Sequence, residues 1–383
     1  MSHVGGWMQT MAEAWLVLTL THNGAAVGAT FAFRFLPVAV FGLWGGTIAD
    51  RFDRRHLLII TQSLAAVLAI GLWLIVWQGQ VAVWMVYALG VSLGFVIVVD
   101  EPARHAFVEE MVGPERVTNA VALTSAVGNS ARITGPAIAG LLIGRVGVEW
   151  VFFANGISFI AVVIALFAMD TKVLQKPKRE TQRPLVREGV RYAWQIHPIR
   201  PTIILVAVVG TLVYNFPTFL SLMAQETFNG DASLAGFLMA LLGVGTVLGA
   251  LFAAQRRTPT TRTTIVAAAM LGTSMLIAVS VPGRLWFEAM LVPVGVLAVF
   301  FGSSANAHLQ ALSSPEYRGR VMAIYTSLTL GTTVVGGPLV GWICQTWTPR
   351  TGIATAGVAT LAAAIALYPR AAQSTTRAAV VVD

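Results

Sequence analysis

The sequence predicts an all-α membrane protein in which twelve transmembrane helices form two six-helix bundles. Three observations predict this fold class. First, 56% of the residues are hydrophobic, only 11% are charged, and the mean hydropathy is +0.74, whereas about a quarter of the residues of a soluble domain are charged. Second, the apolar residues form stretches that are long enough to cross a bilayer. Third, several landmarks recur about 200 residues apart, which indicates a duplicated half.

The apolar stretches have the length of about 20 residues that a transmembrane helix needs. We expect six helices in the first half, at residues 5–21, 26–48, 57–77, 81–99, 117–144 and 150–169. We expect six more in the second half, at residues 201–220, 232–253, 264–282, 285–307, 320–344 and 351–369. Strands of a membrane barrel would alternate over about 10 residues. These stretches are continuously apolar, and only helices satisfy such a backbone in lipid.

Three landmarks support the duplication. Their counterparts lie about 200 residues further on: Gly46 at Gly249, Pro114-Glu115 at Pro315-Glu316, and Gly135-Pro136 at Gly337-Pro338. The copy is weaker at one place, because Ala253 stands where Asp50 would be. A nearly constant offset is typical of membrane carriers built from repeated halves. We therefore expect a bundle at 1–169, a cytoplasmic linker at 170–200, a second bundle at 201–369 and a cytoplasmic tail at 370–383.

The basic residues lie mainly on one side of the predicted membrane. With cytoplasmic termini, twenty of the 25 Lys and Arg residues fall in cytoplasmic connections or the tail. Only Arg145, Arg284 and Arg350 fall on the outer side, and Arg34 and Arg132 lie within spans. This distribution follows the positive-inside rule, so we expect both termini to face the cytoplasm. It also explains the net charge of +8 without a nucleic-acid partner.

The sequence lacks the motifs of several enzyme and pump classes. It contains no Gly-Lys-Ser phosphate loop, which excludes the usual site of ATP hydrolysis, and no Gly-x-Ser-x-Gly nucleophile elbow. No His, Cys and acidic residues gather at metal-ligand spacing, and the single cysteine, Cys344, excludes an internal disulfide. We expect no enzymatic activity, no cofactor and no metal site.

A charged segment between the second and third predicted spans has the pattern Gly-x-x-x-Asp-Arg-x-x-Arg-Arg. Its residues are Gly46, Asp50, Arg51, Arg54 and Arg55. This segment, the six-plus-six arrangement and the long basic central connection resemble the major facilitator superfamily over essentially the whole chain. The resemblance implies two bundles around a central cavity. In such folds spans 1, 4, 7 and 10 line the cavity, and spans 2, 5, 8 and 11 form the moving interface.

Three further strings are similar to the drug and siderophore exporter branch of that superfamily, which includes enterobactin exporters. They are Asp100-Glu-Pro-Ala-Arg104, Asn129-Ser-Ala-Arg132-Ile-Thr-Gly-Pro136 and Arg318-Gly-Arg-Val. The resemblance implies a monomeric, proton-coupled exporter of small amphiphilic compounds in a bacterial inner membrane. Import, lipid flipping and a non-transporting role as a sensor or assembly factor are the alternatives.

Four residues are candidates for the cavity. Glu13 lies within the first predicted span, where a charge is costly and usually faces a cavity. It is the candidate proton-coupling acid, because alternating exposure would change its pKa; the alternative is a neutral acid bonded to a neighbouring helix. Arg34 either lines the cavity or extends to the outer headgroups. Tyr214 and Asn215 occupy the region of the second half that corresponds to Glu13, and they are candidate substrate contacts.

Asp50 is the candidate gate residue. The resemblance implies that it docks on the N-terminus of span 11 and pairs with Arg54. A helix N-terminus stabilises an anion by about 0.3–1 kcal/mol. Asp100 and Glu101, at the inner end of span 4, are further candidate partners of Arg54. The alternative is that these charges only fix the topology.

Span 5 carries a second group of candidates. Arg132 comes three residues before Gly135, so the two share one face of the helix, together with Asn129. We expect Arg132 either to clamp the acids at the end of span 4 or to act in transport. Gly135-Pro136 with Gly140 resembles the antiporter motif of exporters. A notch for close helix packing is the alternative.

Overall fold

The computed structural model is almost entirely helical and describes residues 2–113, 116–170, 199–254 and 259–380. The first half contains α1 (Ser2–Thr21), α2 (Gly24–Arg51), α3 (Arg54–Trp77), α4 (Val83–Val112), α5 (Val117–Val146) and α6 (Glu149–Ala168). The second half begins with α8 (Ile199–Leu212), α9 (Phe216–Leu222), the π-helical η2 (Met223–Thr227), α10 (Ala232–Ala254) and α11 (Thr261–Ser280). It ends with α12 (Arg284–Leu312), α13 (Pro315–Thr326), the π-helical η3 (Ser327–Gly331), α14 (Thr333–Thr346) and α15 (Pro349–Val380). Most of the predicted linker at 170–200 lies outside the described residues.

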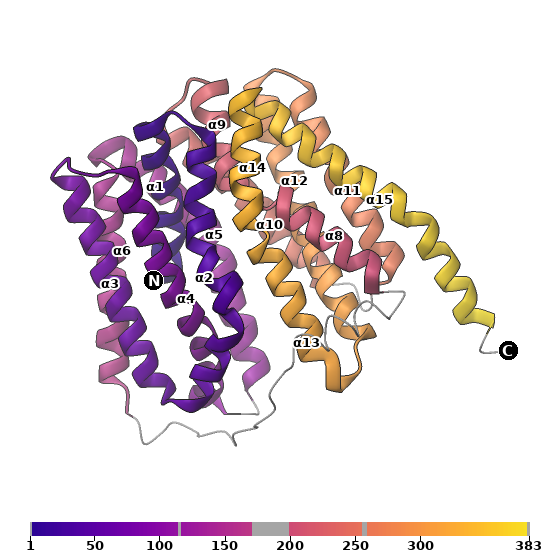
Figure 1. Ribbon diagram of the computed structural model, residues 1–383, viewed down its shortest axis with the longest axis horizontal. Helices are drawn as coiled ribbons and strands as arrows, with labels where there is room; N and C mark the ends of the chain where they lie inside the picture. Colours follow the sequence, from indigo (N-terminus) through magenta and orange to yellow (C-terminus); the bar gives the residue numbers. More distant parts are fainter. Residues whose placement is uncertain (1, 114–115, 171–198, 255–258, 381–383) are drawn as a thin grey trace.

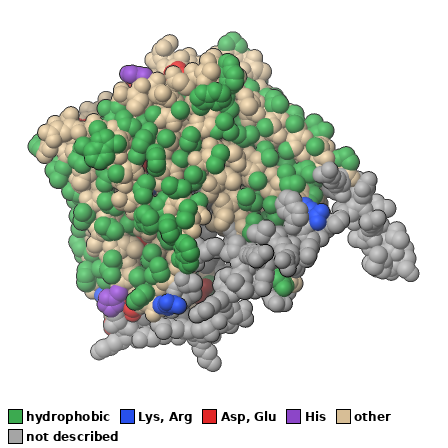
Figure 2. All heavy atoms as spheres, viewed as in Figure 1, with side chains coloured by type: hydrophobic (Ala, Val, Ile, Leu, Met, Phe, Trp, Pro, Cys, Tyr) green, Lys and Arg blue, Asp and Glu red, His purple; other side chains and the backbone are tan. Residues whose placement is uncertain are grey.

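Among the described residues, ten helices are long and apolar enough to cross a membrane. Large apolar side chains such as Val67, Trp84 and Ile164 are more than 60% exposed on the outside of the molecule. Figure 2 shows apolar side chains spread over the visible face, between charged and histidine side chains near its upper and lower edges. Lipid contact explains this surface, because soluble monomers rarely expose such large apolar areas.

Helices α1 and α5 are not among those ten. They are 20 and 30 residues long, so their length suffices for a span. Both carry polar side chains in their middle turns, including Gln9 and Glu13 in α1 and Arg132 in α5. These polar side chains make α1 and α5 less apolar than the ten other helices.

Local capping sets where several helices begin and end. The Asn23 side chain accepts hydrogen bonds of 2.8 and 3.2 Å from two amides in the first turn of α2, and Asp53 accepts one of 2.9 Å in the first turn of α3. Such caps satisfy amides that have no partner within the helix. Gly113 and Gly147 follow α4 and α5 with φ values of 74° and 110°, a backbone conformation that favours glycine.

The continuous helix predicted at 201–220 is wrong, because the chain is interrupted at residues 213–215 between α8 and α9. Pro217 has no amide hydrogen and its ring clashes with the preceding turn, which breaks the helix. The Asn215 side chain donates a hydrogen bond of 2.7 Å to the carbonyl oxygen of Thr211 and so satisfies part of the opened backbone. The helix predicted at 320–344 is likewise divided into α13, η3 and α14.

Helices α1 to α6 lie on one side of the molecule and α8 to α15 on the other (Figure 1). Two close helix pairs join the sides: α2 packs on α14, and α5 packs on α10. A Cβ atom added to Gly337 of α14 would lie 2.5 Å from the carbonyl oxygen of Gly28 in α2, and one added to Gly236 of α10 would lie 2.8 Å from the Cα of Gly140 in α5. Only glycine permits backbones to approach this closely.

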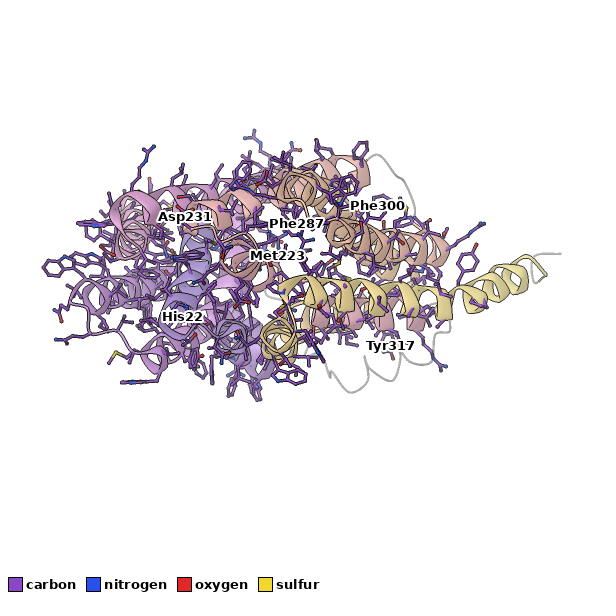
Figure 3. The ribbon with its side chains drawn as sticks, turned by 90° about the horizontal axis from the view of Figure 1, so that it is seen from above. His22, Met223, Asp231, Phe287, Phe300 and Tyr317 are labelled. Atoms are coloured by element: carbon purple, nitrogen blue, oxygen red, sulfur yellow. The ribbon has the colours of Figure 1, made fainter. Side chains whose placement is uncertain are left out.

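These glycine contacts lie at one end of the molecule. Gly28 is in the second turn of α2, shortly after His22, and Gly236 is in the second turn of α10, shortly after Asp231. Figure 3 is viewed from this end, with His22 and Asp231 labelled. The two sides of the molecule are therefore held together at the end where α1 turns into α2.

Candidate functional site

A cavity of about 770 Å³ lies between the two sides of the molecule. Its walls come from α1 to α6 on one side, and from the α8–α9 break, α10, α12 and the α13–α14 region on the other. This volume lies within the range of about 300–1,000 Å³ that is usual for small-molecule sites. The charged and amide residues of the lining are His3, Arg34, Gln62, Asp100, Glu101, Arg104, Arg132, Asn215 and Asn306.

Glu13 and Arg34 form a buried ion pair at the cavity wall. The Nη1 atom of Arg34 lies 3.0 Å from Oε2 of Glu13, and the two side chains are 12% and 2% exposed. Arg34 lines the cavity, and it does not extend to the headgroups. A paired charge within a span costs less free energy than an isolated one. Glu13 therefore contacts a residue of the cavity wall, Arg34, without lining the cavity itself.

Two amide side chains extend this ion pair across the first half. Gln9 donates a hydrogen bond of 2.6 Å to Oε1 of Glu13, and Asn155 donates one to Oε1 of Gln9. Gln9 and Glu13 are four residues apart and share one face of α1. Since Asn155 belongs to α6 and Arg34 to α2, a change in the charge of Glu13 would alter contacts among three helices.

Asp100 of α4 is a second buried carboxylate at the cavity. It accepts hydrogen bonds of 2.7 Å from the Thr61 hydroxyl and from the Gln62 amide. Its other oxygen lies 2.6 Å from Nη2 of Arg104, one turn further along the same helix. Both oxygens are thus satisfied, which is how proteins stabilise a buried charge.

Arg54 pairs with Glu110, and the predicted pairing with Asp100 or Glu101 is not formed. The Nη1 atom of Arg54 lies 3.0 Å from Oε1 of Glu110. Glu110 comes ten residues after Asp100, which is about 15 Å further along α4. The sequence placed the correct helix opposite Arg54 but not the correct turn of it.

The other residues of the charged segment lie around the α2–α3 connection. Arg55 donates a hydrogen bond of 2.7 Å to the carbonyl oxygen of Leu166, which ties α3 to the end of α6. Arg51 is exposed, and open space surrounds the position of a side chain at Gly46. The side chain of Asp50 lies outside the described residues, so its docking on span 11 and its pairing with Arg54 stay predictions.

Asp53, which caps α3, has a pKa below the ordinary value for an aspartate. Its partial burial would raise the pKa. The backbone amide of His56, at 2.9 Å, and the His56 ring, whose Nδ1 lies 3.0 Å from Oδ1, lower it by more. The carboxylate therefore stays ionised at neutral pH and keeps its capping role.

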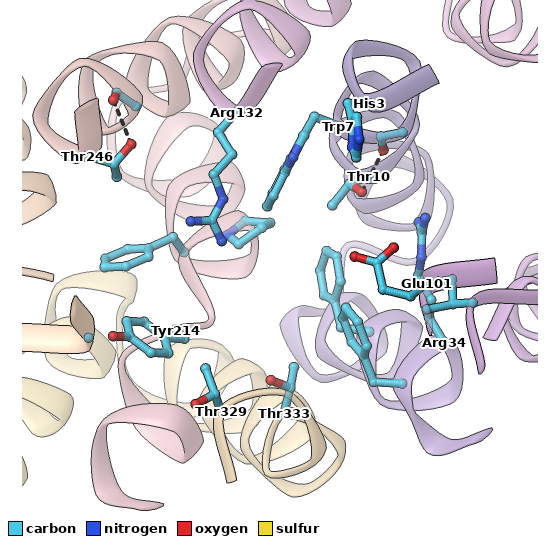
Figure 4. Close-up of a pocket in the computed structure, with 18 of the residues that line it drawn as sticks. His3, Trp7, Thr10, Arg34, Glu101, Arg132, Tyr214, Thr246, Thr329 and Thr333 are labelled. Atoms are coloured by element: carbon cyan, nitrogen blue, oxygen red, sulfur yellow. Dashed lines mark hydrogen bonds between the residues drawn. The ribbon is translucent and has the colours of Figure 1, made fainter. Parts of the chain in front are cut away.

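Arg132 of α5 extends into the cavity and stacks on an aromatic ring. Its Cζ atom lies 4.9 Å from the centre of the Trp7 ring, a distance typical of cation–π contacts. Figure 4 shows the guanidinium beside Trp7, with Tyr214 below it in the view. The predicted clamp to acids at the end of span 4 is not formed, because Asp100 pairs within α4 and Glu101 lies beside His105 at 3.8 Å.

The glycines of α5 make close helix contacts. A Cβ atom on Gly135 would lie 2.6 Å from the Cβ of Trp7 in α1, and one on Gly140 would lie 2.8 Å from a carbonyl oxygen of α10. The carbonyl oxygen of Pro136 faces the same region of α10. These contacts show the packing notch, while the antiporter interpretation stays a prediction. The side chain of Asn129 lies outside the described residues.

Tyr214 and Asn215 lie at the break between α8 and α9, and both line the cavity. The Tyr214 hydroxyl donates a hydrogen bond of 3.2 Å to the carbonyl oxygen of Ala298. From α13, the Tyr325 hydroxyl donates one of 3.0 Å to the carbonyl oxygen of Gly302. The interruption of the helix thus places two polar residues of the second half at the cavity.

Several site residues were not singled out from the sequence: Trp7, Gln9, Asn155 and Tyr325. Gln9 carried a signal, because it precedes Glu13 by one helical turn. The other three come from places that only folding brings to the cavity or its wall. In the described part of the chain, no group of three or more His, Cys, Asp or Glu side chains is placed to hold a metal ion.

Comparison with known proteins gives a consistent result. The sequence profile of the family described as transmembrane secretion effector matches residues 1–381. The chain is 26% identical to the multidrug efflux pump Tap of Mycolicibacterium fortuitum, over 88% of this chain and 85% of that protein. It is 23% identical to the enterobactin exporter EntS of Shigella boydii, over 88% and 81%. It is also 25% identical to the staphyloferrin A transporter of Staphylococcus aureus, but over 65% of this chain and only 63% of that protein.

Solved structures show a similar fold. The nucleoside transporter NupG superimposes with a TM-score of 0.76 at 12% identity and covers 96% of both chains. A bacterial homologue of the human lysosomal transporter Spinster, in an inward-facing and unoccupied conformation, superimposes with a TM-score of 0.72 at 14% identity, over 97% of this chain and 92% of that one. At these identities the likeness concerns the fold alone.

Proposed function

The chain belongs to the transmembrane secretion effector family of major facilitator transporters, and we propose that it exports small amphiphilic compounds in exchange for protons. The family and the similar proteins are membrane transporters and not enzymes. Among those similar proteins, one is named as a multidrug efflux pump and another as an enterobactin exporter. Drugs, siderophores and related metabolites are therefore the proposed substrates.

The proposed architecture has twelve transmembrane helices in two bundles, residues 1–169 and 201–369. Ten described helices qualify as spans by length and composition, and α1 and α5 would bring the number to twelve. Their polar side chains face partners or the cavity, so a lower hydropathy is compatible with a position inside a bundle. We place both termini in the cytoplasm on the basis of the charge asymmetry. A monomer in a bacterial inner membrane is proposed from the resemblance to the exporter branch.

This orientation makes the structure an inward-facing state. The end that contains His22 would be the periplasmic end, where the glycine contacts close the cavity. The cavity extends away from that end toward Asp100, Glu101 and Arg104. Rocking of the two halves would separate the glycine pairs and open the other face, as alternating access requires.

The ion pair between Glu13 and Arg34 is the proposed site of proton coupling. It is the observation that carries the proposal, because it puts a carboxylate in direct contact with Arg34, a residue of the cavity wall, and links it to α2 and α6. Protonation of Glu13 would remove its charge and release Arg34. A conformational change that alters the surroundings of the pair would change its proton affinity.

Reconstitution into proteoliposomes tests this proposal. With a panel of fluorescent drugs and catecholate siderophores, we expect uphill movement of at least one compound when a pH gradient is imposed, and loss of that movement when a protonophore collapses the gradient. Movement that ignores the pH gradient would refute proton coupling. A complete lack of movement across the panel would favour the sensor or assembly-factor alternative.

A further inference from the structure

We propose that the cavity selects organic anions and that Arg132 binds the anionic group of the substrate, which narrows the substrate class of the function proposed above. The first step is the charge balance of the lining. Arg34 is neutralised by Glu13 at 3.0 Å, and Arg104 by Asp100 at 2.6 Å. Among the described residues, Arg132 is the arginine of the lining that no carboxylate pairs with.

The neighbours of Arg132 leave its hydrogen-bond donors available. Its contact with Trp7 occupies a face of the guanidinium plane, and the N–H groups lie within that plane. The nearby titratable groups are the hydroxyls of Tyr214 and Tyr325. Each of these hydroxyls already donates its proton to a backbone carbonyl oxygen, so an anion in this part of the cavity would take its hydrogen bonds from Arg132.

Glu101 is the remaining acid of the lining, and it does not oppose an anion at Arg132. Its side chain is 56% exposed and lies 3.8 Å from His105, whose side chain is also exposed. Figure 4 shows Glu101 on the wall of α4, beside Arg34 and across the opening from Arg132. Water screens an exposed charge over about 8 to 10 Å, so Glu101 repels an anion at Arg132 less than a buried carboxylate would.

The chemistry of the ligand follows from these surroundings. A guanidinium binds a planar carboxylate or a sulfonate through two parallel hydrogen bonds. The cavity of about 770 Å³ is also lined by Trp7, Phe31 and Tyr325, which suit an aromatic or other apolar body. We therefore expect an amphiphilic anion, with the charged group at Arg132 and the apolar part against the aromatic side chains.

A matched set of three probes tests the inference: 2-naphthoate, neutral 2-naphthamide and cationic 2-naphthylmethylammonium share one ring system and differ in charge. Binding to the protein in lipid nanodiscs is measured by equilibrium dialysis, with empty nanodiscs subtracted. The wild-type protein should bind naphthoate at least about tenfold more tightly than naphthamide, the ratio expected for a charge-assisted hydrogen-bonded pair.

Variants separate this role from a structural one. Arg132→Gln should weaken naphthoate binding about tenfold and leave naphthamide binding unchanged. Arg132→Lys keeps the charge but loses the two parallel hydrogen bonds, so it should keep only part of the preference. Arg132→Glu should reverse the preference toward the cation, a gain that a misfolded protein would not show. Arg145→Gln, an exposed position on the same helix that does not line the cavity, should change nothing.

Equal affinities of the wild-type protein for the three probes would overturn the inference, as would an equal loss of all three in Arg132→Gln. The dialysis measures binding without a gradient. An anion preference in a protein that moves no compound in proteoliposomes would therefore leave the inference intact and refute the proposed function. Export of compounds by a protein without any anion preference would support the proposed function and refute the inference about Arg132.

Discussion

Breaking the ion pair of Glu13 and Arg34 from one side should cost more stability than removing it from both sides. The pair is separated by 3.0 Å and its side chains are only 2% and 12% exposed. Removing one partner of a buried pair costs about 3–5 kcal/mol, because the other charge is left without compensation. We expect losses of this size for Glu13→Gln and for Arg34→Gln.

The double variant leaves two amides that still hydrogen-bond and no charge. It should therefore regain about 2–4 kcal/mol relative to the sum of the single losses, well above the deviation of about 0.5 kcal/mol between independent sites. The free energies of unfolding are measured in mixed micelles by titration with a denaturing detergent. A matched control is the pair of Arg284 and Glu288, at 2.6 Å with Arg284 53% exposed, whose coupling should stay below about 1 kcal/mol.

Additive losses for Glu13→Gln and Arg34→Gln would refute the role of the pair in holding α1 to α2.

The same variants test transport. Glu13→Gln should bind substrate and lose uphill export driven by a pH gradient, while downhill exchange survives. If it accumulates a gradient as steep as the wild-type protein does at the same pH difference, Glu13 is not the coupling acid, and Asp100 or Glu101 becomes the next candidate.

Three further predictions concern topology, gating and the glycine contacts. A cysteine introduced near Arg284 should react with a reagent confined to the outside, and one near Lys176 should not; the reverse pattern would invert the assigned orientation. Asp50→Asn should lower transport several-fold without loss of the protein from the membrane, and it should increase cysteine labelling at the cytoplasmic ends of α2 and α13. Unchanged transport would mean that the charged segment only fixes the topology. Gly337→Val should lower transport at least about tenfold and increase cysteine labelling of the periplasmic end, because its Cβ would lie 2.5 Å from a backbone oxygen of α2. The control is Gly71→Val, at a position with open space around it. Equal effects of the two variants would refute the close-packing argument.

The sequence by itself predicted the helical membrane class, and the resemblance to the major facilitator superfamily that it suggested is confirmed. Several boundaries agree within a few residues: the stretch at 232–253 became α10 (Ala232–Ala254), and the stretch at 117–144 became α5 (Val117–Val146). These features are local, because lipid requires a continuous apolar helix and caps such as Asn23 act within one turn. The break at residues 213–215 was missed because the run is mostly apolar and long enough for a span, although Pro217 carried the signal.

The partners of the charged residues were decided only by the tertiary structure. Arg54 meets Glu110 and not Asp100, and Arg132 meets Trp7 and not an acid of α4. Each of these contacts joins residues more than 50 positions apart, so it depends on how two helices are shifted and rotated against each other. A shift of one turn, about 5.4 Å along a helix, is enough to exchange one partner for another. The average hydropathy of the helices is the same in every such arrangement, so only the packing of the helices against one another selects among them.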